Sequence, residues 1–189
     1  MIVNGAVYRT HDDNLQYFFF QPPAFQMIAN IDRARLAGVE LDMQALVARG
    51  LQLFASIGTT DTKILRNRID PSVVGNKTPR AQPWTTNLGL QYERPLSGAL
   101  GLMMRLDYQH RSKRYWQADN LAVQEPLEFV DARIGLQADR WSIFAFGRNL
   151  LDEEYYAEFA TPSVTGFPVP FAALGEPATY GIEMRYRFD

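Results

Sequence analysis

Apolar and polar residues alternate along much of this chain, and this period of two constrains the fold more than any other feature. The clearest run, 100–111, carries apolar side chains on one parity: Leu100, Leu102, Met104, Leu106 and Tyr108. Its other parity is mostly polar: Gly101, Met103, Arg105, Asp107, Gln109 and Arg111. Successive side chains of a β-strand point to opposite faces, so the run predicts a strand with one apolar and one polar face.

Similar runs predict an all-β antiparallel meander of about nine long strands, each near the ten residues that a tilted strand needs to cross a bilayer. The expected strands cover residues 1–10, 15–20, 37–45, 51–57, 84–93, 100–111, 128–138, 141–149 and 178–188. Between Trp141 and Asn149 both parities carry apolar residues. The pattern therefore leaves the lumen-facing parity of that strand open.

The connections between these strands alternate in length. Short turns are expected near residues 11–14, 47–50, 95–98 and 139–140, and longer loops near 21–26, 64–80, 115–126 and 157–176. Outer-membrane barrels have short periplasmic turns and long outer loops, whereas a β-sandwich has no reason to sort its connections this way. Sandwich strands are also usually shorter, at about five or six residues. The pattern favours a membrane barrel over a soluble β fold, which stays the alternative.

Composition narrows the remaining classes. The net charge of -2 gives no strongly basic surface for nucleic acid, and the absence of cysteine removes disulfides and thiolate metal sites. No apolar run of about 18 residues exists, so a transmembrane helix is excluded. Residues 1–13 lack the pattern of a secretory signal. If the protein is exported, its signal is expected upstream of these residues.

Four segments together resemble the C-terminal part of the β-barrel of TonB-dependent outer-membrane receptors. They read NIDRARLAGVELDMQALVARGLQLFASIG (30–58), PRAQPWTTNLGLQYERPL (79–96), GRNLLDEEYY (147–156) and GEPATYGIEMRYRF (175–188). The family commonly ends on an aromatic residue, whereas Asp189 follows Phe188 here. The resemblance marks Tyr186 and Phe188 as a barrel-assembly signal, with Phe188 in the penultimate place.

The resemblance implies a 22-stranded transmembrane β-barrel whose lumen is filled by an N-terminal plug domain. Residues 1–189 would then be the C-terminal portion of the barrel, with the plug, its TonB box and the N-terminal strands absent. The short turns, 11–14 included, would lie on the periplasmic side of a Gram-negative outer membrane. The fragment alone would be an open sheet with two unpaired edges, 1–10 and 179–188, which promote aggregation in water.

The resemblance implies that the protein is an outer-membrane receptor and active transporter for a scarce ligand, which is expected to be a ferric siderophore. In the complete protein, transport would be energised through TonB. Implied partners are outer-membrane lipid and lipopolysaccharide, the TonB complex, the barrel-assembly machinery and the ligand. No cofactor, metal, nucleic acid or enzymatic activity is expected. The alternatives are a passive porin-like barrel and a soluble β-sandwich binding protein. A hydrolase would need catalytic partners for His11 or His110, and the sequence supplies none.

Candidate ligand-binding residues lie on the expected outer loops, where binding residues concentrate. Arg114, Tyr115 and Trp116 mix cations with aromatic rings, which suits an anionic or catecholate ligand, although an aromatic girdle explains them equally well. The loops 70–83, with Lys77 and Arg80, and 161–177 are candidates by position alone. The acidic run Asp152–Glu154 has the composition of a cation site. A solvated rim just above the membrane is the alternative reading of that run.

Overall fold

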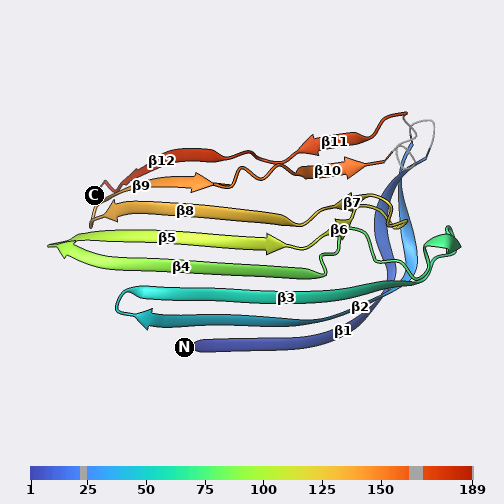
Figure 1. Ribbon diagram of the computed structural model, residues 1–189, viewed down its shortest axis with the longest axis horizontal. Coiled ribbons are helices and arrows are strands. Elements are labelled where there is room, and N and C mark those ends of the chain that lie inside the picture. Colours follow the sequence, from blue (N-terminus) through green and yellow to red (C-terminus); the bar gives the residue numbers. More distant parts are fainter. Residues whose placement is uncertain (22–24, 162–167, 189) are drawn as a thin grey trace.

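The chain forms one long antiparallel sheet, with two small two-stranded sheets at one end (Figure 1). The computed structural model describes residues 1–21, 25–161 and 168–188, with the side chains of 18–27 left aside. The large sheet has eight strands in the order β1-β2-β3-β4-β5-β8-β9-β12. Its strands are β1 (Ile2–Gln21), β2 (Phe25–Ala48), β3 (Leu51–Arg66), β4 (Trp84–Ser97), β5 (Leu100–Arg111), β8 (Leu127–Gln137), β9 (Trp141–Arg148) and β12 (Thr179–Tyr186).

Each small sheet extends a hairpin of the large one. β6 (Arg114–Tyr115) pairs with β7 (Val123–Gln124) between β5 and β8. β10 (Tyr156–Ala160) pairs with β11 (Phe171–Leu174) between β9 and β12. A 3-10 turn, η1 (Pro71–Val73), lies between β3 and β4. Among the described residues no helix is long and apolar enough to cross a membrane.

The tight turns of the large sheet lie at one end of it, which we call the turn end, at three of the four places that the sequence predicted (Figure 1). β2 and β3 are joined at Arg49–Gly50, β4 and β5 at Gly98–Ala99, and β8 and β9 across residues 138–140. Gly50 and Gly98 adopt φ of 75° and 55°, a region in which glycine has no steric cost. The long connections 67–83, 112–126 and 149–178 lie at the opposite end, which we call the outer end.

The turn predicted at residues 11–14 is wrong. Residues 2–21 form one strand, and His11, Asp12 and Asp13 pair in register with Arg35, Ala34 and Arg33 of β2. Only Asn14 departs from the extended backbone conformation, with φ of 64°, and the same pairing register continues from Leu15 onward. The large sheet therefore has eight strands rather than about nine, and β1 and β2 are much longer than ten residues. The connection expected near 21–26 reduces to residues 22–24, which lie outside the described part.

The two faces of the large sheet differ in polarity, as the alternation predicted. One face, which we call the lipid face, exposes a band of large apolar side chains: Val39, Leu41, Leu88, Leu90, Met104, Leu106, Ile134, Ile182 and Met184. The opposite face, which we call the lumen face, carries Asn87, Arg105, Asp107 and Arg133. A face that exposes so much contiguous apolar surface indicates contact with lipid.

The faces of β9, left open by the sequence, follow from its register. Phe144 and Phe146 pair with Glu183 and Gly181 of β12, and Phe146 also pairs with Arg133 of β8. Phe144 and Phe146 therefore lie on the lumen face with Arg133. Ile143 and Ala145 lie on the lipid face. Both parities of this strand are apolar because the lumen face here consists of phenyl rings on which arginines stack.

A small apolar core lies beyond the membrane band, at the outer end. It is formed by Ile31, Ala34, Ile64, Val73 and Ala118, none of them more than 6% exposed. Leu15, Tyr17 and Leu36 pack against it. These residues come from β1, β2, β3 and the two long connections, so the outer loops fold onto the projecting strands as one unit. The soluble sandwich is rejected, because the eight long strands make a single continuous sheet.

Candidate functional site

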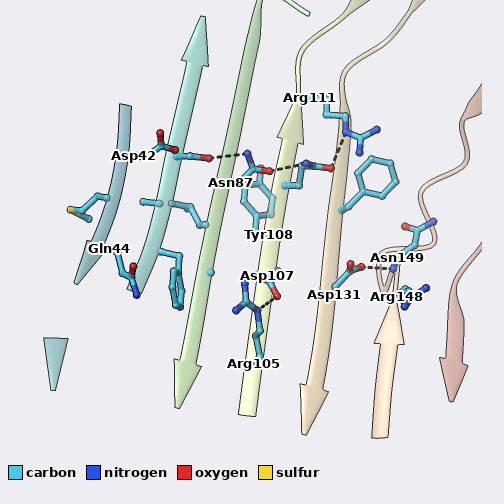
Figure 2. A pocket seen from close by; sticks show the side chains of 18 of the residues that line it. Asp42, Gln44, Asn87, Arg105, Asp107, Tyr108, Arg111, Asp131, Arg148 and Asn149 are labelled. Atoms are coloured by element: carbon cyan, nitrogen blue, oxygen red, sulfur yellow. Dashed lines mark hydrogen bonds and ion pairs between the residues drawn. The ribbon is translucent and has the colours of Figure 1, made fainter. Parts of the chain in front are cut away.

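Hydrogen-bonded polar side chains cross the lumen face from strand to strand (Figure 2). Asn87 on β4 donates from Nδ2 to Ser56 Oγ at 3.0 Å and accepts from Gln109 Nε2 at 2.7 Å. Gln109 in turn accepts from Arg111 Nε at 2.8 Å. Residues on one face of neighbouring strands lie close enough for such contacts because their register is fixed. The network fixes the positions of donors and acceptors that line a concave hollow of about 610 Å³.

An ion pair on β5 lies next to this network. Arg105 donates to both carboxylate oxygens of Asp107, at 2.7 and 2.8 Å, and to Gln91 Oε1 at 3.0 Å. The spacing of two residues puts both side chains on one face of the strand. Such a two-donor arrangement holds the guanidinium in one orientation.

Four lumen-face arginines each lie over a phenyl ring of another residue on the same face. The pairs, with the distance from guanidinium carbon to ring centroid, are Arg105 with Phe54 at 5.1 Å, Arg111 with Phe129 at 5.0 Å, Arg133 with Phe144 at 4.1 Å, and Arg148 with Phe146 at 5.4 Å. Cations within about 6 Å of a ring face are attracted by its quadrupole. The sequence analysis missed these pairs, since in three of them the ring and the cation come from different strands; Arg148 and Phe146 both lie on β9.

The motif around Asn149 is structural in this fold. Asn149, at φ 49°, donates from Nδ2 to the carbonyl oxygens of Glu153 and Glu176, both at 3.1 Å, and its Oδ1 accepts from the Glu153 N–H at 2.9 Å. Asp152 Oδ1 accepts from the Ala178 N–H at 2.9 Å. These bonds fasten the segment after β9 to the start of β12. Within the described residues no group of three acidic, His or Cys side chains is placed to hold a metal ion.

The predicted ligand-binding residues lie at the outer end, around Trp116. Arg114 and Tyr115 form β6, and Trp116 follows, only 3% exposed. The Trp116 ring lies 4.5 Å from the Arg114 guanidinium carbon and 5.7 Å from that of Arg80, and its centroid is 6.1 Å from that of Phe159. The structure brings the three predicted residues together, and ligand binding by them stays a prediction.

Charge is unevenly balanced around Trp116. Arg80 binds Glu158 of β10 through two bonds, at 3.0 and 2.5 Å, whereas Arg114 makes no ion pair within the described part of the chain. Burial lowers the pKa of Arg114, and the positive charges of Arg80 and Arg111 lower it further. Arg114 Nε is buried and lacks a hydrogen-bond partner among the described residues. A hollow of about 900 Å³ opens beside these groups, lined also by Tyr17, Ile69 and Phe171. The arrangement suits a ligand with aromatic and anionic groups.

Sequence reasoning missed Glu158 and the hydrogen bonds that Asn120 makes at this end. Asn120 Oδ1 accepts from the Lys77 N–H at 2.8 Å, and its Nδ2 donates to the Lys77 carbonyl at 3.0 Å, which locks two connections together. Neither contact has a local sequence signal. Of the loop 161–177, residues 162–167 lie outside the described part. Lys77 and Arg80 were candidates by position alone. Lys77 forms an ion pair with Asp61, and Arg80 forms one with Glu158.

The remaining candidates lie apart from both regions. Tyr186 and Phe188 are 58% and 85% exposed at the turn end, with ring centroids 4.9 Å apart in an edge-to-face contact. Their role in barrel assembly stays a prediction. His11 lies on β1 and His110 on β5, where His110 Nδ1 is 3.6 Å from Glu128 Oε1. The two histidines belong to strands that are not neighbours, so they do not form a common site.

The family model for the β-barrel of TonB-dependent receptor-like proteins matches residues 2–150. The chain belongs to this family. Membership confirms the predicted fold class and the outer-membrane location. The family consists of receptors and transporters rather than enzymes.

Solved structures show the same fold. The ferric yersiniabactin uptake receptor FyuA from Yersinia pestis is similar, with a TM-score of 0.81 and 21% identity over 99% of this chain and 27% of FyuA. BauA, the ferric preacinetobactin receptor from Acinetobacter baumannii, is similar with a TM-score of 0.74 and 16% identity over 97% of this chain and 27% of BauA. The copper transporter OprC is similar with a TM-score of 0.74 and 13% identity over 98% of this chain and 28% of OprC. The chain spans about a quarter of the length of these proteins.

Proposed function

We propose that this chain forms the C-terminal part of the barrel wall and outer vestibule of a TonB-dependent receptor that imports a ferric siderophore. The observation that supports the ligand class is the cluster around Trp116: Arg80, Trp116 and Phe159 line a hollow at the outer end, and Arg114 lies against the Trp116 ring. Anionic ferric complexes with aromatic groups would find cations and ring faces there. FyuA and BauA, which share the fold, are receptors for ferric siderophores.

In the complete receptor, the lumen face would contact the plug domain that the family carries. The ordered donors and acceptors of Asn87, Gln109 and Arg105 suit contacts with another polar surface. Energy would come from the TonB complex acting on the plug, and the barrel-assembly machinery would read Tyr186 and Phe188. Outer-membrane lipid and lipopolysaccharide would surround the lipid face. No part of this scheme requires catalysis by the chain.

The test is uptake of radioactive iron by cells that carry or lack the gene, with a panel of ferric siderophores. We expect uptake of at least one complex that depends on both the gene and TonB. Arg114→Gln should weaken saturable binding of that complex, while Arg94→Gln, at the turn end, should not. Gene-dependent uptake that persists without TonB would indicate a passive barrel instead.

Copper uptake is the second candidate, because OprC shares the fold as closely as BauA does. The same cells, tested with copper, distinguish the two: gene-dependent accumulation of copper without siderophore-bound iron would replace the siderophore proposal.

A further inference from the structure

The hollow of about 900 Å³ at the outer end has more acids than bases on its lining. Among the described residues that line it, three are carboxylates, Asp70, Asp119 and Glu158, and one is a cation, Arg80. Arg80 and Glu158 neutralise each other through the two hydrogen bonds between them. Asp70 and Asp119 are therefore the charges that the hollow presents to a ligand.

Neither Asp70 nor Asp119 makes an ion pair within the described part of the chain. Each carboxylate accepts hydrogen bonds through Oδ1 only, from groups close by in the sequence. Asp70 accepts from the N–H and the hydroxyl of Ser72, at 3.1 and 2.5 Å, and Asp119 accepts from the Leu121 N–H at 3.0 Å. Both aspartates are half-buried, so water and salt screen a charge beside them less than they would on an open loop.

Aromatic rings form another part of the lining: Tyr17, Trp116, Phe159 and Phe171. The centroids of the Trp116 and Phe159 rings lie 6.1 Å apart, and Phe171 is 63% exposed. Ring faces attract cations through their quadrupole, and the attraction grows as the cation loses its water. Aromatic rings and carboxylates without a counterion in one hollow therefore favour a ligand that carries an ammonium or guanidinium group.

A buried acceptor on the lining favours the same kind of ligand. Gln117 lines the hollow, and its Nε2 donates to the Phe159 carbonyl at 3.2 Å, which fixes the end of the amide that is oxygen. Gln117 Oε1 is buried and accepts no hydrogen bond from the described residues. A buried acceptor without a donor costs free energy, so this part of the lining favours a ligand that brings N–H donors.

Two cations of this region lie against the Trp116 ring. The guanidinium carbons of Arg114 and Arg80 are 4.5 and 5.7 Å from its centroid. An anionic iron centre suits these cations, whereas a basic group suits Asp70 and Asp119. The two preferences are compatible in one ligand that carries both charges.

We propose that the hollow selects ferric siderophores whose organic part carries a protonated amine or guanidinium group, which Asp70 and Asp119 bind among the aromatic rings. The inference rests on the proposed function, because it takes the hollow as the place where the imported ligand is received. It adds the charge of the ligand's organic part. A ligand with a neutral organic part, or with further carboxylates there, is disfavoured.

The test measures binding of three phenols of matched shape to the full-length protein in detergent, by ligand-observed NMR titration. Tyramine carries an ammonium group, tyrosol carries a hydroxyl in its place, and 4-hydroxyphenylacetate carries a carboxylate. We expect tyramine to bind at least about tenfold more tightly than either analogue, from charge pairing and cation–π attraction together.

Two double variants show where the preference arises. Asp70→Asn with Asp119→Asn keeps the shape of both side chains and removes their charge. Asp139→Asn with Glu93→Gln removes two exposed carboxylates at the turn end and is the matched control. The first variant should bind tyramine about tenfold more weakly and change tyrosol binding less than twofold. The control should change the binding of both probes less than twofold.

Several results would overturn the inference. These are tighter binding of 4-hydroxyphenylacetate than of tyramine, an equal loss of tyramine binding in both variants, or an equal loss of tyramine and tyrosol binding in the first variant. The assay contains neither iron nor a transport step. The expected tyramine preference in a protein that imports no ferric siderophore would therefore refute the proposed function alone. Siderophore uptake without that preference would refute this inference alone.

Discussion

At the scale of single residues, two asparagines in the left-handed region fasten connections that are distant in sequence. Asn120, at φ 60°, bonds to both the N–H and the carbonyl of Lys77, and Asn149 bonds to Glu153 and Glu176. Asparagine enters this region more readily than most residues, and its amide supplies both a donor and an acceptor. The outer loops therefore depend on a few side chains whose loss leaves backbone groups unpaired.

Replacement of Asn120 by alanine should release the connection 67–83 from the connection 112–126. Unpaired backbone groups and the loss of a side chain that tolerates φ 60° together favour local opening by about 2 kcal/mol. Tryptic cleavage after Lys77 or Arg80 should become at least about tenfold faster. Asn14→Ala is the control, because Asn14 has φ 64° and no side-chain hydrogen bond among the described residues. Equal acceleration in both variants would assign the effect to strain alone.

The pH dependence of the same connection should follow Asp32, which lies on β2 beyond the membrane band. The hydrogen bonds from the Arg68 side chain, at 2.7 Å, and from its N–H, at 2.6 Å, lower the pKa of Asp32. A lowered pKa stabilises the folded state above the ordinary value of about 4, and this stabilisation is lost as pH falls through the lowered pKa.

Hydrogen exchange of residues 67–76, corrected for its intrinsic pH dependence, checks this expectation. Protection should persist at pH 4 and fall only below it. Arg68→Gln keeps the hydrogen bond from the backbone N–H of residue 68 and removes the one from the guanidinium, which lowers the pKa of Asp32 most. Protection of these amides should therefore be lost at a higher pH in the variant. Protection that fell at the same pH in both proteins would show that Arg68 does not control Asp32.

At the scale of elements, alternation in the sequence predicted most strands and both of their faces, because lipid and lumen impose opposite polarities on successive residues. It failed at residues 11–14, where His, two Asp and Asn have the composition of a turn. Cross-strand partners on β2, including Arg33 and Arg35, keep that segment extended. The outer site was only partly predictable, since the pairing of Arg80 with Glu158 joins residues 78 positions apart.

The close packing of β8 against β9 requires glycine at position 135. A β-carbon there would lie 2.2 Å from the Ile143 carbonyl oxygen and 2.3 Å from Phe144 Cδ1. Gly135→Ala should displace Phe144 from Arg133 and destabilise the barrel by about 1–3 kcal/mol. At Gly101 the nearest atom would be 3.7 Å away, so Gly101→Ala is the control. The folded fraction, resolved as the faster band on unheated gels, should fall only for Gly135→Ala.

The lipid face should reject charge that the lumen face accepts. Leu106, 48% exposed at the middle of the apolar band, should tolerate arginine poorly, at a cost of about 2–4 kcal/mol. Gln44→Arg on the lumen face, exposed and opposite Ile2 and Phe54, is the matched control. The denaturant midpoint of unfolding in lipid vesicles measures both variants. A smaller loss for Leu106→Arg than for Gln44→Arg would reverse the assignment of the faces.

At the scale of the whole molecule, the sheet has β1 and β12 at its two edges and sorts its connections by length between its two ends. Residues 2–150 match the barrel model of the family, and the chain spans about a quarter of FyuA. Both facts agree with the segment of barrel wall predicted from strand length and loop asymmetry.

The central claim is that these strands span the outer membrane with the long connections outside the cell. The chain contains no cysteine, so single cysteines can be introduced without removing native ones from it. Leu121, 79% exposed on a long connection, and Ser97, exposed beside a tight turn, are suitable positions. A membrane-impermeant maleimide should label Leu121→Cys in intact cells, and Ser97→Cys only after the outer membrane is permeabilised. Labelling of Ser97→Cys in intact cells, with Leu121→Cys protected, would contradict the account.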